Sequence, residues 1–481
     1  MAAAAILAAA TALPASLDAM STRQADTITG TLRLAAAENA MAQAPADWTT
    51  FGHDLANTRT AQETTLSAAN IGSVRTRWNA AGAAVTGTPA IVGGIAYYSD
   101  FDGYLHARNA TTGAQIWRTR LRDTMLPGSP YVSGDSVYVA GDAGFVYAVN
   151  RATGQRRWGV DIESTPNDRI WSSPVLAGNT VIVGTGSYQV FIEATPVYRG
   201  SVVGLDPATG RQKWRASVCD APCTGVSVWS SAAVDLTARL AYIGTGQSYY
   251  TPAGPMSDAL VAINIDTGRI VWSRQFTAGD SYTAYTSNPG GRDYDIGAAP
   301  NLFAINGRAV VGVGDKGGMY KVFDRLTGAL IWERRVSNGT PLGGVEHTTA
   351  YASGTIYGVA NTSINPGDGR SSATPNQGAV WALDAATGTL RWFREISEGG
   401  FGGVAVANGL MYFTTWEGTL RVHRISDGVA VLNRYIGLSS APTPIERGSA
   451  SGPSISGGLI YVGYGWTWDL RARGGVIALG L

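Results

Sequence analysis

The sequence predicts an all-β fold, an eight-bladed β-propeller, on three observations. A Thr-Gly-x3-Trp motif recurs six times, each time after an apolar alternation typical of strands. A seventh, degenerate copy carries Leu432 in place of Trp. The copies follow one another without a break, which overrides the several domains that 481 residues would ordinarily suggest. The six full copies begin at Thr112, Thr153, Thr209, Thr267, Thr327 and Thr387.

The second repeat shows what each unit contains. Alternating β-branched and aromatic residues predict strands, and a tight turn at 150–154 separates the last two, where Gly154 can adopt positive φ. One repeat is therefore a four-stranded antiparallel blade, and its Trp is expected to pack between neighbouring blades. The four strands are expected at 129–132, 137–139, 145–149 and 156–160.

The two ends of the chain predict how the ring closes. Seven repeats end near Leu432, and an eighth, from 453 to 479, has three strands and no fourth. Residues 74–78 carry the same Trp, Trp78, with no Thr-Gly turn before it. We expect this N-terminal strand to complete the last blade, because that pairing leaves no exposed sheet edge.

Composition narrows the function classes. The net charge of +1 gives no electrostatic footprint for nucleic acid, and no later stretch is long and apolar enough to span a bilayer. Residues 1–46 form an apolar, signal-like segment and a linker, and 47–481 are expected to form a single propeller domain. We therefore expect a periplasmic or secreted protein.

Cys219 and Cys223 share one loop and form either a local disulfide or a pair of thiols.

Insertions are expected to gather on one face of the ring. The spacing between successive repeat Trp residues is 39 to 41 in the first blades and 56 to 60 in the middle ones. The Thr-Gly turn keeps its length, so the growth falls between the second and third strands and between blades. Those two connections lie on the same face, which we name the crown, and a one-sided crown of loops usually builds a binding site.

Several crown residues are candidates for chemistry. Trp171 and Trp229 begin successive blades, where an indole can lie flat against a planar ligand. Asp293 and Asp295 lead into the fifth blade and could supply a general base or metal ligands. Lys316, one of three lysines, lies in a Gly-flanked turn and could bind an anionic group.

Further polar residues lie near the predicted axis. Glu346 and His347 open the sixth blade, and Trp416 and Glu417 lie in the seventh. The other three histidines fall outside the crown; two of them, His106 and His423, are expected on third strands with structural roles. No nucleophile elbow, P-loop, Rossmann fingerprint or haem-attachment motif is present in the sequence.

An ordered set of loop motifs resembles the pyrroloquinoline-quinone (PQQ) dehydrogenase propellers, and most closely the polyvinyl-alcohol dehydrogenase-like branch. The blade motif alone is shared with non-enzymatic scaffolds, whereas these loops are more specific. The motifs are Phe51 to Arg59, Tyr198 to Val203, Val228 to Ser231, Ser257 to Ala262 and Pro341 to Gly344.

The resemblance implies a quinoprotein that oxidises a small or polymeric alcohol by hydride transfer to PQQ, assisted by Ca²⁺ and an Asp base. Trp229 is similar to the Trp that stacks on the quinone, Asp295 to the base and Lys316 to the cation that contacts the quinone. A separate electron acceptor such as a cytochrome c is implied. Ser172 resembles a ring-edge position, Trp171 and His347 are further cofactor candidates, and Glu193, Gln247 and Asp295 are the implied calcium ligands.

Two departures from the branch keep other functions open. Pro196-Val197 stand where adjacent cysteines are usual, and Gln247 stands where the calcium Asn is usual. One alternative is a cofactor-less scaffold or binding propeller of the cell envelope. Another is a quinone-free enzyme that uses Glu346, His347 and the Asp293/Asp295 pair.

Overall fold

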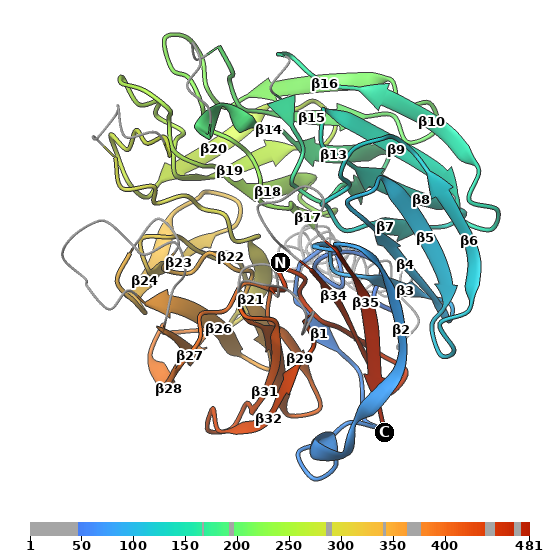
Figure 1. Cartoon of the computed structure of the whole chain (residues 1–481). Helices are drawn as coiled ribbons and strands as arrows, with labels where there is room; N and C mark the ends of the chain where they lie inside the picture. The colour runs from blue at the N-terminus through green and yellow to red at the C-terminus, as the bar shows by residue number, and fades with distance from the viewer. Residues whose placement is uncertain are drawn as a thin grey trace, which may run out of the picture. The chain divides into compact units, whose positions relative to one another are not determined.

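The computed structural model describes residues 47–165, 168–191, 197–284, 291–339, 343–362, 377–437, 448–465 and 473–481. Residues 46–481 form one compact unit, in which β-sheets surround a common centre (Figure 1). The predicted eight-bladed, all-β propeller is confirmed. The expected signal-like segment and linker at 1–46 lies outside the described residues, as do Glu193 and Pro196.

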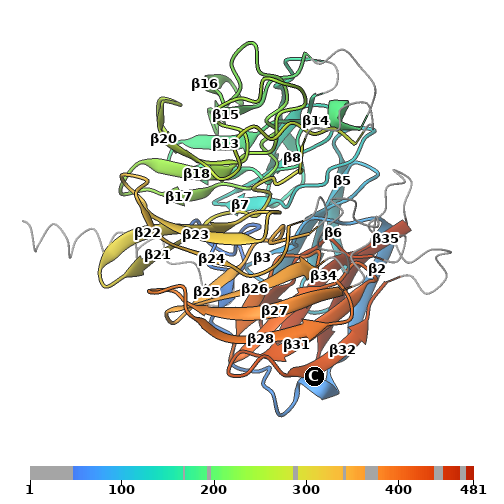
Figure 2. The same ribbon diagram turned by 90° about the vertical axis from the view of Figure 1, so that its left-hand side faces the viewer.

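Each blade is a four-stranded antiparallel sheet that begins at the centre, and neighbouring blades follow one another as layers (Figure 2). Blades 1 and 2 are β3 (Ala90–Val92), β4 (Ile95–Ser99), β5 (Tyr104–Asn109), β6 (Gln115–Arg120) and β7 (Tyr131–Ser133), β8 (Ser136–Ala140), β9 (Phe145–Asn150), β10 (Arg156–Asp161). Blades 3 and 4 are β12 (Val175–Ala177), β13 (Thr180–Gly184), β15 (Ser201–Leu205), β16 (Gln212–Ser217) and β17 (Ala233–Asp235), β18 (Leu240–Gly244), β19 (Ala259–Asn264), β20 (Ile270–Gln275). Blades 5 and 6 are β21 (Asn301–Ile305), β22 (Arg308–Gly314), β23 (Met319–Asp324), β24 (Leu330–Arg335) and β25 (Ala350–Ala352), β26 (Thr355–Thr362), β27 (Gln377–Asp384), β28 (Leu390–Ile396). Blades 7 and 8 are β29 (Ala405–Ala407), β30 (Leu410–Thr414), β31 (Thr419–Arg424), β32 (Ala430–Tyr435) and β33 (Ser454–Ser456), β34 (Leu459–Tyr464), β35 (Arg473–Gly480), β2 (Arg75–Ala83).

The N-terminal strand completes blade 8, as the sequence predicted. Strand β2 pairs antiparallel with β35, and Trp78 lies opposite Ala478. The outer strand of this blade therefore comes from the start of the chain, whereas the other seven blades are each continuous in sequence. The ring is therefore closed by hydrogen-bonded pairing between β2 and β35, which are distant in the sequence, and not by a loop that joins these two strands.

The repeated Trp packs on the repeated Gly of the following blade. A Cβ added to Gly268 would lie within 2.7 Å of Trp214, so only glycine leaves room for the indole. The indole Nε1 of Trp214 also donates a hydrogen bond to the Ile265 carbonyl in that turn, at 3.1 Å. The same glycine contact recurs between Trp78, Trp117, Trp158, Trp272, Trp332, Trp392 and Gly113, Gly154, Gly210, Gly328, Gly388, Gly428 respectively.

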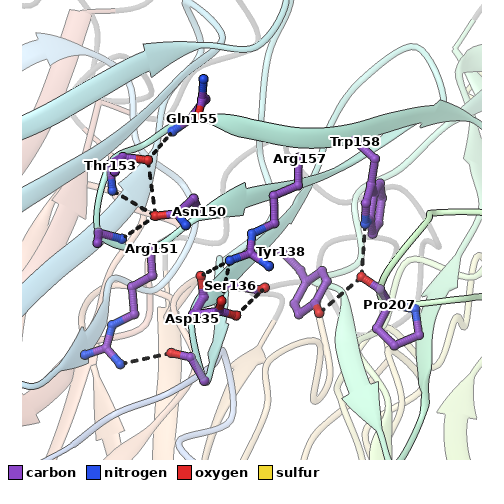
Figure 3. Close-up of polar contacts among 12 residues, drawn as sticks. Asp135, Ser136, Tyr138, Asn150, Arg151, Thr153, Gln155, Arg157, Trp158 and Pro207 are labelled. Carbon is purple, nitrogen blue, oxygen red and sulfur yellow. Dashed lines mark hydrogen bonds and ion pairs between the residues drawn. The ribbon is translucent and has the colours of Figure 1, made fainter.

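Each Thr-Gly turn is built by a side chain three residues before the Thr. In blade 2 the Asn150 Oδ1 accepts hydrogen bonds from the amide and the hydroxyl of Thr153 (Figure 3). Gly154 then takes a φ of 72°, which favours glycine. Trp158 in the next strand donates to the Pro207 carbonyl of blade 3 (Figure 3). The motif is therefore longer than Thr-Gly-x3-Trp and includes this Asn or Asp.

The degenerate seventh copy has a structural cause. Gly428 keeps a positive φ of 71° because Trp392 packs on it. Leu432 faces blade 8, which has no Thr-Gly turn because its outer strand is β2. A short 3-10 helix, η1 (Ile71–Ser73), lies against β32 instead. Arg434 donates to the Val74 carbonyl at 3.0 Å, so polar contacts replace part of the Trp–Gly packing between blades 7 and 8.

The segment 48–61 occupies the centre of the ring. Its backbone hydrogen-bonds to the innermost strands of blades 1, 2, 4, 5, 6 and 7, through Ile91, Val132, Val234, Leu302, Tyr351 and Val406. Strand β1 (Thr60–Ala61) pairs parallel with β29. Arg59 is fully buried and donates to carbonyls of blades 7 and 8, including Val404 at 2.6 Å and Pro453 at 3.1 Å. This segment satisfies inner edges that would otherwise be unpaired.

The remaining elements belong to crown loops. Strands β11 (Asp168–Arg169) and β14 (Gly186–Ser187) form a small ribbon, and η2 (Tyr188–Val190) follows it. Cys219 and Cys223 form a disulfide, which settles the alternative left open above. Within the described ranges, no helix has the length and apolarity needed to cross a bilayer.

Candidate functional site

Three side chains, Asp293, Asp295 and Trp229, surround the ammonium group of Lys316. Lys316, in the turn between β22 and β23, has its Nζ 3.2 Å from Asp293 Oδ1 and 3.2 Å from Asp295 Oδ2. The Trp229 indole, which precedes blade 4, donates to the same Asp295 Oδ2 at 3.0 Å. Lys316 Nζ lies 5.4 Å from the centre of that indole, within cation–π range. The three residues that the sequence proposed as stacking ring, base and cation thus lie together.

The backbone holds Asp295 in place from two sides. The amide of Gln247 donates to Asp295 Oδ1 at 2.8 Å, and the Lys316 amide donates to the Asp295 carbonyl at 2.9 Å. Both carboxylate oxygens of Asp295 therefore accept hydrogen bonds. Asp293, by comparison, has a φ of 57°, and the ammonium of Lys316 is the partner of its Oδ1.

A glycine sets the position of the indole. A Cβ added to Gly297 would lie 1.8 Å from Cη2 of Trp229, so the ring rests directly on this backbone. Trp229 is only partly buried, whereas Asp293, Asp295 and Lys316 are 7, 5 and 7% exposed. The cluster therefore has a partly accessible ring beside a nearly buried set of charges.

Burial and mutual charge shape the titration of the cluster. Burial raises the pKa of Asp293 to about 8, with Asp295 adding to the shift and Lys316 opposing it. Burial alone would lower the pKa of Lys316, but the two carboxylates outweigh burial and raise it. Lys316 therefore stays charged at neutral pH, and Asp293 is the carboxylate that holds a proton more tightly than an exposed Asp.

Glu346 and His347 are the other axis-side candidates, and the charges of Glu346 and Lys316 act on one another. Burial raises the pKa of Glu346 to about 7, and its Oε2 has no hydrogen-bond partner. His347 packs edge-on against Phe401 at 5.3 Å and lies 3.3 Å from the Asn361 amide nitrogen. Burial lowers the pKa of His347 to about 3, so its imidazole is neutral at physiological pH.

Trp171 and Ser172 have other contacts. Trp171 meets Tyr188 and Phe191 edge-on, at 5.9 and 6.4 Å. The Ser172 hydroxyl exchanges two hydrogen bonds with the Gly184 backbone, each of 3.0 Å, and Ser230 makes the equivalent pair with Gly244 in blade 4. Ser172 therefore fills a position that also links strands in the next blade.

The structure describes two of the three proposed calcium ligands, Gln247 and Asp295. Glu193 lies outside the described residues. Gln247 directs its side-chain amide to the Tyr282 carbonyl at 3.2 Å, and its backbone amide to Asp295. In the part of the chain that the structure describes, no three His, Cys, Asp or Glu side chains are grouped so as to hold a metal ion.

Sequence reasoning overlooked two acids beside this cluster. Asp280 accepts from the backbone amides of Arg292 and Tyr294, at 2.7 and 2.9 Å, and so shapes the loop that carries Asp293. Asp258 is fully buried, and neither of its carboxylate oxygens has a partner. Burial raises the pKa of Asp258 well above its usual value, and the charge of Asp295 adds to the shift. An acid directly before the apolar run 259–263 was the available signal.

The comparisons with known proteins support the fold and the family. A family model described as outer membrane protein assembly factor BamB matches residues 60–291, 221–371 and 316–480. The chain belongs to this family of propellers. It is a PQQ dehydrogenase-like eight-bladed propeller, as the resemblance implied.

Curated relatives include polyvinylalcohol dehydrogenases. The protein from Sphingopyxis sp. (strain 113P3) is 30% identical over 326 residues, which cover 58% of this chain and 49% of the relative. The protein from Pseudomonas sp. is 26% identical over 493 residues, which cover 90% of this chain and 76% of the relative. The chain thus matches about half the length of the first relative and three quarters of the second.

Solved structures with the same fold include an alcohol dehydrogenase and BamB. The quinohemoprotein alcohol dehydrogenase from Comamonas testosteroni gives a TM-score of 0.73 at 21% identity, covering 92% of this chain and 81% of that one. BamB from Moraxella catarrhalis gives 0.59 at 15% identity, covering 85% and 100%. At these identities the likeness establishes the fold alone.

Proposed function

We propose that this chain is a quinoprotein oxidoreductase that oxidises an alcohol with PQQ as its cofactor. The observation that carries the proposal is the meeting of Trp229, Asp295 and Lys316 at one point between blades 4 and 5. A planar ring, a carboxylate and a fixed cation are the three groups that such chemistry needs from the protein. Relatives named as polyvinylalcohol and quinohemoprotein alcohol dehydrogenases support the same class.

The residues present fit a planar, acidic cofactor. Trp229 is fixed from below by Gly297 and is partly accessible, so it would hold the ring system by stacking. Lys316 would contact oxygens at the ring edge. Trp171, Ser172 and His347 are proposed at the margin of the same site, where substitutions should weaken PQQ binding less than Trp229→Ala does. When bound, PQQ supplies an acceptor for the hydride of an alcohol.

The protein would move the proton through the acids around Lys316. Asp295 Oδ2 lies beside the indole and would accept the hydroxyl proton of the alcohol as general base. Lys316 touches both acids and would stabilise the negative charge that remains after the proton leaves. Asp293, with its raised pKa, would hold a proton on the far side of the ammonium.

Calcium belongs to the proposal as a partner of these acids, with Asp295, Gln247 and Glu193 as its candidate ligands. One ammonium faces two carboxylates at 3.2 Å, and Asp258 and Asp280 lie nearby, so the cluster would carry excess negative charge if all four acids were ionised. A hard cation that prefers oxygen ligands suits that excess. The amide of Gln247 that points to Tyr282 is the feature that fits calcium least.

The first test is a titration of the metal-free protein with PQQ, with and without Ca²⁺, followed by Trp fluorescence and melting temperature. Stoichiometric quenching with a calcium-dependent rise in melting temperature is expected. Asp295→Asn should retain PQQ binding but lower dye-linked alcohol oxidation by about 10²-fold or more, since the general base is lost. Asp123→Asn, whose side chain is 88% exposed, is the matched control. An unchanged rate in Asp295→Asn would remove this residue from the mechanism.

A scaffold or binding propeller is the second candidate, because the matching family model bears the name of an outer membrane assembly factor. The same titration separates the two functions. A folded protein that neither quenches nor gains stability with PQQ would favour a protein partner on the crown. Turnover without quinone, linked to His347 or Glu346, would favour quinone-free chemistry.

The proposal includes an extracytoplasmic location and a separate electron acceptor such as a cytochrome c. The Cys219–Cys223 disulfide supports an oxidising compartment, where such bonds persist. A reduced cytochrome c that accumulates only when protein, PQQ and alcohol are all present would support the acceptor.

A further inference from the structure

A pocket separate from the Lys316 cluster lies on the crown side of the seam between blades 4 and 5. Its volume is about 390 Å³, and it is lined by the exit of blade 4 at 276–278, by Arg292 and Tyr294, and by strands β23 and β24. The inserted connection between the two blades forms one wall, so this insertion does more than cover the centre of the ring. The volume is within the usual range for small-molecule sites and well above that of a single inorganic anion.

The strand register explains the chemistry of the opposite wall. Met319 pairs with Arg335 and Lys321 pairs with Glu333 across β23 and β24, so all four side chains project from the same face. Arg334 and Tyr320 point to the other face. The pocket therefore receives two cations and one acid from alternate positions of two strands.

Two guanidinium groups in this pocket lack an acidic partner. Lys321 pairs with Glu333 at 3.1 Å and lies over the Phe276 ring at 4.5 Å. Among the described residues, Arg335 donates to the carbonyls of Gly317 and Ser337, and Arg292 lies 5.9 Å from the Tyr294 ring. Within the described ranges neither arginine forms an ion pair, so their charges are available to an anion.

The remaining lining residues limit the kind of anion. Phe276, Tyr294 and Met319 offer an apolar surface, which favours an organic body. Glu333 and the buried Asp315 also line the pocket and would repel a highly charged ligand. We propose that this pocket binds a small organic carboxylate, with Arg292 and Arg335 on the carboxylate and the apolar residues on its body.

The pocket shares two chain segments with the candidate active site. Asp315 directly precedes Lys316, and Tyr294 lies between Asp293 and Asp295. Burial raises the pKa of Asp315 to about 7, with Lys321 and Arg335 opposing the shift. An anion held by these cations weakens their effect on Asp315 and moves that pKa further up. The pocket does not depend on PQQ being the cofactor, because its lining contains none of Trp229, Asp295 and Lys316.

Calorimetric titration of the full chain with benzoate, without quinone or alcohol, tests the proposal. Benzoate should bind saturably, and benzamide, a neutral molecule of the same shape, should bind at least tenfold more weakly. Arg335→Gln and Arg292→Gln should each weaken benzoate at least tenfold. Arg334→Gln, on the opposite face of β24, should leave it unchanged.

Two variants guard against a folding artefact, because the Arg335 side chain also donates to the Gly317 carbonyl, whereas the Arg292 side chain contacts the Tyr294 ring and bonds no turn among the described residues. Melting temperatures of all variants should match that of the unaltered chain. Absence of saturable benzoate binding, equal binding of benzamide, or unchanged affinity in both Gln variants would overturn the proposal.

Discussion

At the residue scale, the site depends on contacts that only glycine permits and on acids that water does not reach. Trp229 rests on the Gly297 backbone and bonds Asp295, so the ring and the base are positioned by one another. Asp293 and Lys316 complete a nearly buried charge cluster. Small changes at these positions should therefore alter ligand binding before they alter the fold.

Gly297→Ala tests the position of the indole. The new methyl group would overlap Cη2 of Trp229, so the ring must move away from Asp295. We expect PQQ affinity, measured by Trp quenching, to fall at least tenfold while the far-UV circular dichroism stays unchanged. Gly82→Ala is the control, since nothing lies within 4 Å of its added Cβ. Equal affinity in both variants would mean that the indole does not hold the cofactor.

His347 predicts an acid-sensitive component of stability. Burial lowers its pKa in the folded chain to about 3, while the unfolded chain takes up the proton near pH 6.5. The unfolded state therefore binds more protons between these values, and stability is lost as pH falls from about 6.5 to about 3. At pH 4.5 this amounts to roughly 2–3 kcal/mol.

Chemical denaturation at pH 7 and pH 4.5 measures that loss. His347→Gln keeps a hydrogen-bonding side chain but cannot take up a proton, so it should lose less stability on acidification than the unaltered chain. The same pH dependence in both proteins would show that His347 is not the titrating group.

At the element scale, each blade is joined to the next by a Trp on a Gly. The turn that presents the Gly is shaped by an Asn or Asp, and the indole nitrogen bonds a carbonyl in the same turn. Leu432 breaks the series where the next blade has no such turn. The repeated motif therefore reflects the packing of one blade on the next as much as the strand and turn propensities of its residues.

Trp214→Leu tests this packing. Loss of the ring volume over Gly268 and of the bond to the Ile265 carbonyl should cost about 2–4 kcal/mol. Urea denaturation measures the change. Leu432→Trp is the matched substitution in the opposite direction, and it should bring no gain, since blade 8 presents no Thr-Gly turn on which the indole could pack. A stabilised Leu432→Trp protein would contradict the packing account.

At the scale of the whole molecule, closure depends on non-covalent pairing between the two ends of the chain: β2 pairs with β35 in blade 8, and β1 pairs with β29 in blade 7. In seven blades the outer strand follows the third strand directly, whereas β2 reaches β35 from the other end of the chain. The segment 48–61 adds bonds to six inner strands from the centre. Damage at blade 8 should therefore open a sheet edge, and damage elsewhere should not.

Trp78→Ala and Trp272→Ala compare the two situations. Both remove an indole from a glycine of the next blade, and each should cost about 3–5 kcal/mol. Only Trp78→Ala loosens an outer strand that is not continuous in sequence with the rest of its blade, so it alone should speed hydrogen exchange along β35 and cause association on size-exclusion chromatography. Identical exchange and monomeric behaviour in both variants would rule out blade 8 as the weak point.

The repeat determined most of the fold from the sequence alone. Period-2 alternation, the Thr-Gly turn and the Trp are local signals, and counting them predicted eight blades and the pairing of 74–78 with the last one. The same period placed the insertions on one face. The residues Trp229, Asp295 and Lys316 were found because each stands at a junction on that face, although their roles remain proposals.

Only the tertiary structure decided which junction residues meet. Trp171 and Trp229 begin successive blades with the same local sequence, yet only Trp229 reaches Asp295, because the acid comes from the connection that follows blade 4. The lack of a hydrogen-bond partner for Asp258 and the reason for Leu432 depend on neighbours distant in the chain, so the sequence did not reveal them. Local patterns specify blades because strands and turns depend on residues that are close together in the sequence. A site between blades depends instead on how the ring brings loops from different blades together.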